Sequence, residues 1–76
     1  MTGAAHWHLT YAPEVASEPV LWELSQRFGL HTNIRRASVD EHLAWVIVEV
    51  RGEAESLVAA RVWLGERGVQ VAELPG

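Results

Sequence analysis

Residues 43–51 constrain the fold of this chain more than any other segment. Their side chains alternate as in a β-strand: one side carries Ala44, Val46, Val48 and Val50, and the other carries Trp45, Ile47, Glu49 and Arg51. Large apolar groups occur on both sides, whereas a strand with one solvated face carries them on one side only. We therefore expect this strand to lie in the middle of its sheet.

The remaining periodic segments predict three further strands and two helices. Apolar or β-branched residues mark residues 6–11, 31–39 and 69–74 as strands. Apolar residues recur at helical spacing over residues 17–28 and 53–67. Ser17 would cap the first helix, and Gly29 and Gly68 stand where left-handed C-terminal caps are expected.

The order strand–helix–strand–strand–helix–strand predicts an α+β fold of the ferredoxin-like βαββαβ type. In this two-layer sandwich, both helices cover one face of a four-stranded antiparallel sheet. Right-handed crossovers place the first and third strands in the middle and the second and fourth at the edges. The 76 residues make a single domain, with a core over about residues 6–74.

Composition excludes several classes of function. The chain has no cysteine, so disulfides, thiolate zinc sites and thiol catalysis are ruled out. Its net charge is −4 and its basic residues are six arginines, which argues against a nucleic-acid partner. No apolar stretch is long enough to span a membrane and no secretion signal begins the chain, so we expect a cytoplasmic protein. No catalytic motif occurs, and we expect neither an enzyme nor a cofactor.

An ordered set of short motifs resembles the NIL domain family, which is named for an Asn-Ile-Leu tripeptide. The motifs are Leu9-Thr10-Tyr11, Glu18-Pro19, Arg27-Phe28-Gly29-Leu30, Asn33-Ile34, residues 46–50 before Gly52, and Leu64 through Gly68-Val69 to Leu74. Together they cover about residues 7–74. Arg35 replaces the leucine of the tripeptide, the hairpin at residues 40–43 lacks the expected glycines, and the two histidines of the first strand are unusual for the family.

The resemblance implies a ferredoxin-like fold close to that of ACT domains. NIL domains are best known at the C-terminus of methionine-importing ABC transporter ATPases, where they pair, bind the transported amino acid and regulate transport. They also occur in some ferredoxins. The resemblance therefore implies a regulatory domain that binds an amino acid at or near a homodimer interface.

The face of the sheet opposite the helices, which we call the open face, is the predicted location of the site. It would carry His6, His8, Thr10, Asn33, Arg35, Trp45, Ile47 and Glu49. Covering Trp45 and Ile47 with a second copy would contribute a few kcal/mol at about 25 cal/mol per Å2. We therefore expect a homodimer whose interface contains His6, His8, Thr10, Arg35, Trp45, Ile47 and Glu49. The alternative is that these are ordinary exposed residues.

Several of these side chains, and the pair Arg35-Arg36 on the predicted edge strand, have two interpretations. His6 and His8, with His31 at the same end of the sheet, should lie near Glu49 and could bind zinc or nickel, but solvated histidines are the commoner case and we predict no metal. His8 could instead make a dimer contact pH-dependent. Asn33 could bind a ligand or satisfy the backbone. Arg35-Arg36 could clamp a carboxylate or simply solvate an edge strand.

Our sequence-based hypothesis is a small-molecule-sensing domain with Asn33, His8, Trp45 and Ile47 at the ligand. The alternative is a ligand-free interaction module that uses the open face or an edge strand to bind another protein.

Overall fold

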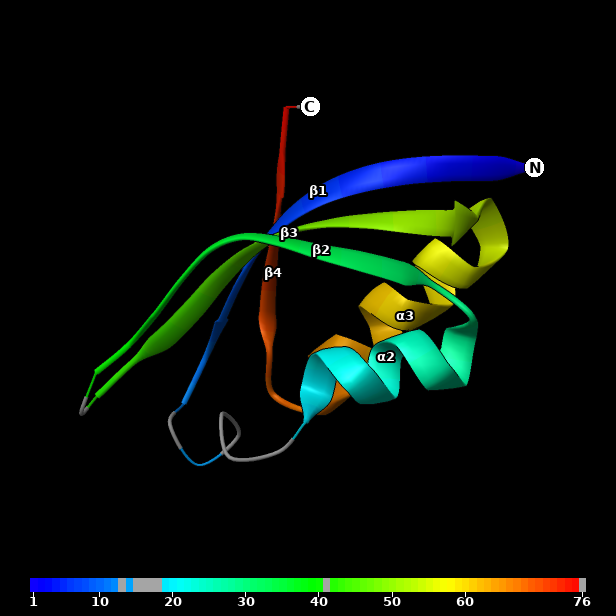
Figure 1. Cartoon of the computed structure of the whole chain (residues 1–76). Helices are drawn as coiled ribbons and strands as arrows, with labels where there is room; N and C mark the ends of the chain where they lie inside the picture. The colour runs from blue at the N-terminus through cyan, green and yellow to red at the C-terminus, as the bar shows by residue number, and fades with distance from the viewer. Residues whose placement is uncertain (13, 15–18, 41, 76) are drawn as a thin grey trace.

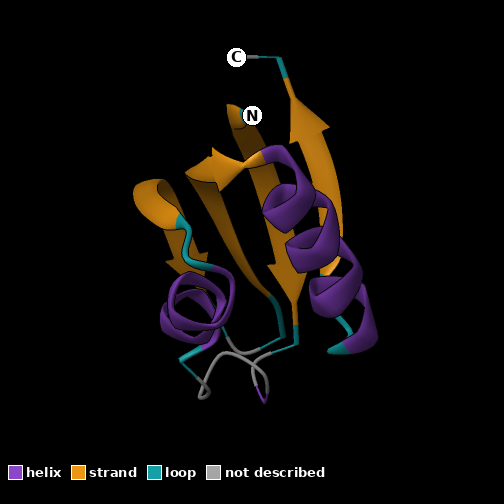
Figure 2. Ribbon diagram, turned by 90° about the vertical axis from the view of Figure 1, so that its right-hand side faces the viewer, coloured by secondary structure: helices purple, strands orange, loops and turns teal. Residues whose placement is uncertain are grey.

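The computed structural model describes residues 1–12, 14, 19–40 and 42–75. These residues form β1 (Thr2–Tyr11), α2 (Val20–Phe28), β2 (His31–Val39), β3 (Ala44–Glu53), α3 (Ala54–Glu66) and β4 (Gln70–Leu74). All neighbouring strands pair antiparallel in one sheet of order β2-β3-β1-β4. Both helices lie on the same face of this sheet (Figures 1 and 2). The predicted ferredoxin-like α+β fold and the central position of residues 43–51 are confirmed.

The core lies between the helices and the two central strands. Trp7 and Leu9 from β1 alternate with half-buried residues, and from β3 Val46, Val48 and Val50 point to the same side; all five are at most 2% exposed. Leu24 of α2 and Ala60 and Leu64 of α3 are fully buried against them. The alternation of β1 and β3 therefore decides which face of the sheet the helices cover.

Each helix is followed by a glycine in the left-handed conformation, which caps α2 directly and follows the cap residue Arg67 of α3. Gly29 has a φ of 65° after α2, and Gly68 has a φ of 81° after α3. The Ser25 hydroxyl donates to the Leu30 carbonyl at 2.6 Å, which fastens the chain where it turns into β2. Helix α2 begins after Pro19, and the predicted cap Ser17 lies outside the described residues. Among the described residues, no helix is long and apolar enough to cross a membrane.

The strands differ from the sequence prediction at their ends. β1 starts at Thr2 rather than His6, because residues 2–5 pair with the last residues of β3, which extends to Glu53. The Ala54 N–H donates to the Met1 carbonyl at 2.8 Å and closes this end of the sheet. The added segment Gly3-Ala4-Ala5 has no alternating pattern, so the sequence did not reveal it. β4 begins at Gln70, one residue later than expected.

We predict opposite effects from adding a methyl group at two glycines. A Cβ at Gly52 would collide with the side chain of Leu30, which is buried, so Gly52→Ala should lower the free energy of unfolding by about 1–3 kcal/mol. Gly65 lies in α3 with no atom within 4 Å of a new Cβ, so Gly65→Ala should raise it by up to about 1 kcal/mol. Urea unfolding of both variants and of the wild type measures these changes in the free energy of unfolding. A Gly52→Ala variant as stable as the wild type would contradict the close packing of β3 against Leu30.

Candidate functional site

The open face has no helix over it in the described part of the chain (Figure 2). The cross-strand register places on this side His6, His8, Thr10, His31, Asn33, Arg35, Arg36, Ser38, Trp45, Ile47, Glu49, Arg51, Gln70 and Ala72. In the two central strands, the residues between these positions point to the other side of the sheet and form the core. Every candidate side chain that the sequence placed on the open face therefore lies there.

An aromatic and apolar cluster occupies one half of the open face. The imidazole of His8 stacks on the indole of Trp45, with ring centroids 5.5 Å apart and an angle of 20° between the planes. Ile47 lies directly across from His8 in the register, and Thr10 lies across from Trp45. All four residues are half-buried within a single chain because they cover one another. The cluster is therefore a flat, preformed platform for an apolar group.

Glu49 is the charged centre of the other half. Its side chain is 11% exposed, and its carboxylate oxygens lie 3.2 Å from His6 Nε2, 3.5 Å from an Arg35 Nη atom and 3.5 Å from an Arg51 Nη atom. Three different strands supply these groups, since His6 lies on β1, Arg35 on β2 and both Glu49 and Arg51 on β3. The carboxylate thus links the strands across the open face.

The surroundings of Glu49 keep it ionised. Burial by itself raises the pKa of the Glu49 carboxyl, but the charge and hydrogen bond of Arg51, with the charges of Arg35 and His6, hold it below its usual value. Glu49 is therefore a charged hydrogen-bond acceptor that already contacts three basic side chains.

The open face is basic although the chain as a whole has a net charge of −4. In the described part of the chain, the cationic or titratable basic side chains on this side are Arg35, Arg36, Arg51, His6, His8 and His31, whereas its carboxylates are Glu49 and Glu53. Arg35 and Arg36 are both exposed, so an anion from solution can reach them, although Arg35 also contacts Glu49. This distribution favours a ligand or partner with a negatively charged group.

A β-bulge brings in one residue that the sequence analysis did not place on the open face. The register between β2 and β3 shifts after Ile34, so that Arg36, not Arg35, pairs with Ile47. Both arginines then lie on the open side, since Arg35 reaches Glu49 from within the bulge. Strict alternation from Asn33 would have put Ala37 there instead. Asn33 itself lies opposite Glu49 and is exposed.

The structure shows which groups the histidines of the open face contact. Over residues 1–12, 14, 19–40 and 42–75, no group of three or more His, Cys, Asp or Glu side chains gathers closely enough to hold a metal ion. His6 instead contacts Glu49, and His8 contacts Trp45 and, at 3.4 Å, the Thr10 hydroxyl.

Comparison with known proteins gives one family match and several structural matches. The family model of the NIL domain matches residues 5–73. No curated protein matches the chain in sequence. The C-terminal domain of an ABC transporter ATP-binding protein from Enterococcus faecalis is 16% identical with a TM-score of 0.79, over 95% of this chain and 84% of that chain. A de novo designed protein, Ferredog-Diesel, is 18% identical with a TM-score of 0.57, over 96% and 85%. At these identities the structural likeness shows the fold alone.

We predict that Glu49 makes the protein sensitive to acid. The pKa of Glu49 is lowered in the folded state from its usual value of 4.5. Ionised Glu49 therefore stabilises the folded protein at pH values above 4.5, and this stabilisation is lost as the pH falls through the lower pKa of the folded state. The free energy of unfolding should therefore fall less steeply in Glu49→Gln than in wild type between about pH 5 and pH 3. Urea unfolding at a series of pH values measures both curves.

Asp40 provides an independent comparison. Backbone N–H groups of His42 and Leu43 lower its carboxyl pKa within the hairpin, so Asp40→Asn should remove a separate part of the acid sensitivity. In the double variant, the two changes in the free energy of unfolding should add. Parallel curves for wild type and Glu49→Gln would show that the cluster around Glu49 does not form.

Proposed function

This chain belongs to the NIL domain family, and we propose that it is a regulatory domain that senses a small molecule, with an amino acid as the ligand. Membership of this family supports a role that is regulatory and not catalytic. We place the protein in the cytoplasm. The open face is the proposed binding surface.

The observation that carries this proposal is that the open face holds charges of both signs beside an apolar platform. An α-amino acid presents a carboxylate, an ammonium group and a side chain from a single carbon. Arg35 lies 3.5 Å from Glu49, so the two could bind the carboxylate and the ammonium group of one molecule. The apolar side chain would then rest on Trp45 and Ile47, next to the His8–Trp45 stack. Asn33, opposite Glu49, would donate a further hydrogen bond.

A second copy of the chain would enclose this ligand. The interface that we propose contains His6, His8, Thr10, Arg35, Trp45, Ile47 and Glu49. Burial of the half-exposed platform favours association, at about 25 cal/mol per Å2 of apolar area. The arginines of two facing copies repel each other, and a bound carboxylate would reduce that repulsion. We therefore propose that ligand binding and dimerisation are coupled.

A ligand-free interaction module is the second candidate. The observation that favours it is the edge strand β2, where Ile34 is 55% and Val39 66% exposed. Apolar side chains beside unpaired backbone groups can add a strand from another protein. In this case the domain would bind a protein target without any small molecule.

Thermal unfolding against the twenty amino acids separates the two candidates. A ligand that binds only the folded protein at about 100 times its Kd adds roughly 2.7 kcal/mol of stability, so one or two amino acids should raise the Tm by several degrees. Arg35→Gln should abolish the rise. Arg27→Gln is the matched control, because Arg27 is exposed on α2 on the other side of the sheet, and it should leave the rise unchanged. No response to any amino acid at millimolar concentration would favour the interaction module.

The dimer is tested by charge substitution at two tryptophans. Trp45→Asp places a carboxylate on the open face and should give a monomer by sedimentation with an unchanged far-ultraviolet circular dichroism spectrum. Trp22→Asp is the control, since Trp22 is 63% exposed on α2. That variant should associate like wild type. An intact dimer of Trp45→Asp would place the interface elsewhere.

A further inference from the structure

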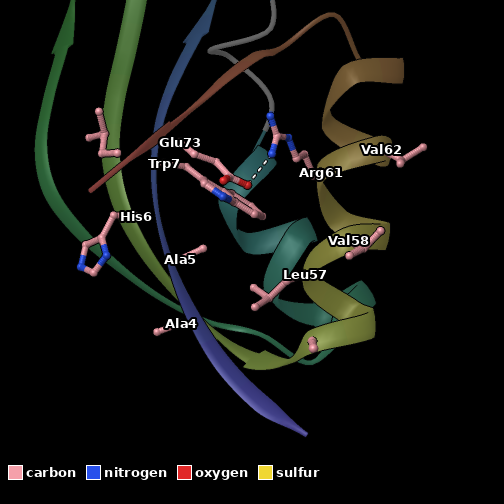
Figure 3. Close-up of a pocket in the computed structure, with 11 residues that line it drawn as sticks. Ala4, Ala5, His6, Trp7, Leu57, Val58, Arg61, Val62 and Glu73 are labelled. Atoms are coloured by element: carbon pink, nitrogen blue, oxygen red, sulfur yellow. Dashed lines mark hydrogen bonds and ion pairs between the residues drawn. The ribbon is translucent and has the colours of Figure 1, made fainter. Parts of the chain in front are cut away.

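A hollow lies between α3 and the end of the sheet where β4 no longer follows β1, and of the open-face residues discussed above only His6 also lines it. β4 pairs with β1 only from His6 to Thr10, so residues 2–5 of β1 pair with β3 alone in the described sheet. Helix α3 passes over this part of β1, and the space between them is a hollow of about 670 Å3. Figure 3 shows Ala5 and Trp7 on one side of it and Leu57, Val58 and Arg61 on the other. Its size is sufficient for a small organic molecule.

The wall that α3 supplies is mainly apolar. Leu57 is half-buried, Val58 is 68% exposed and Val62 is 59% exposed. No described residue buries these two valines. An apolar wall left open to solvent gains stability from any ligand that covers it.

Two of the residues that line the hollow, Arg61 and Glu73, form an ion pair. Arg61 of α3 donates to the carboxylate of Glu73 on β4 (Figure 3). The Arg61 side chain is 47% exposed and that of Glu73 is 60% exposed. A pair so exposed adds little to stability, so exchange of its partners costs little.

Trp7 lies beside this ion pair with an unused hydrogen-bond donor. The residue is 1% exposed, and its indole Nε1 has no partner among the described residues. Trp7 and Glu73 are cross-strand partners, so their side chains project from the same side of the sheet next to each other. Figure 3 shows the Glu73 carboxylate close to the indole. A buried N–H without an acceptor destabilises the protein, and Glu73 is the nearby group that could accept it.

We propose that this hollow binds small amphiphilic carboxylates, in which an apolar body carries one carboxylate group. The body would lie along Leu57 and Val58, and the carboxylate would take the place of Glu73 on Arg61. Glu73, once released, would accept the hydrogen bond from Trp7 Nε1. Binding thus exchanges one ion pair for another and adds one hydrogen bond that the free protein lacks.

The same comparison of ion pairs and hydrogen bonds disfavours an amphiphilic amine. An amine would take Glu73 away from Arg61, which would leave the guanidinium without its carboxylate and Trp7 Nε1 still without an acceptor. A neutral alcohol of the same length would gain apolar contacts only. The arrangement of Arg61, Glu73 and Trp7 therefore selects for a negative charge on the ligand.

Titration with octanoate, followed by ¹H–¹⁵N NMR, tests this site. Tryptophan indole N–H signals are separate from backbone amides, and loss of one signal in Trp7→Phe identifies that of Trp7. We expect a saturable downfield shift of the Trp7 indole proton as its hydrogen bond to Glu73 forms. Octanol and octylamine at equal concentrations should give at most a small shift of this signal.

Two arginine variants complete the test. Arg61→Gln should weaken octanoate binding by about tenfold or more, because it removes the charged partner of the carboxylate. Arg35→Gln, on the open face, should bind octanoate like wild type, so failure here is distinguishable from failure of amino-acid sensing. An unmoved Trp7 indole signal, equal shifts with octanol, or undiminished binding by Arg61→Gln would each overturn the proposal.

Discussion

The structure depends on the fact that its central strand β3 carries large apolar side chains on both sides, while two helices can cover only one side. β1 and β3 direct Trp7, Leu9, Val46 and Val48 toward α2 and α3, where all four are almost completely buried. The same strands direct His8, Trp45 and Ile47 the other way. Because side chains alternate strictly along a strand, the sheet cannot turn both sets inward. A four-stranded sheet with two helices therefore retains a surface that is neither core nor ordinary solvent-exposed face.

Contacts between the side chains of the open face stabilise this second surface. His8 covers the ring of Trp45, and Glu49 draws His6, Arg35 and Arg51 toward the centre of the sheet. These contacts hold the side chains in one arrangement without burying them completely. A surface prepared in this way loses little conformational entropy when a ligand or a second copy binds. This is the physical reason for our proposal that the open face is the regulatory surface.

The sequence predicted the element order, the strand order and the composition of the open face, because each depends on periodicity and glycine position. It did not reveal the start of β1, since Gly3-Ala4-Ala5 pairs through its backbone and has no side-chain pattern. It also missed the bulge that adds Arg36, because alternation cannot show where one extra residue enters a strand. The hollow under α3 depends on how far β4 follows β1, which is a property of the assembled sheet. No pattern in the sequence indicated it.

The central claim is that a second copy covers the open face when ligand is bound, and an isotope-filtered NOE experiment tests it most directly. Labelled and unlabelled protein are mixed in the presence of the amino acid that raises the Tm. We expect contacts between the Ile47 methyl groups of one protomer and the Trp45 ring of its partner. Intermolecular contacts confined to the helices, or a ligand-bound monomer with Ile47 still exposed, would contradict the account.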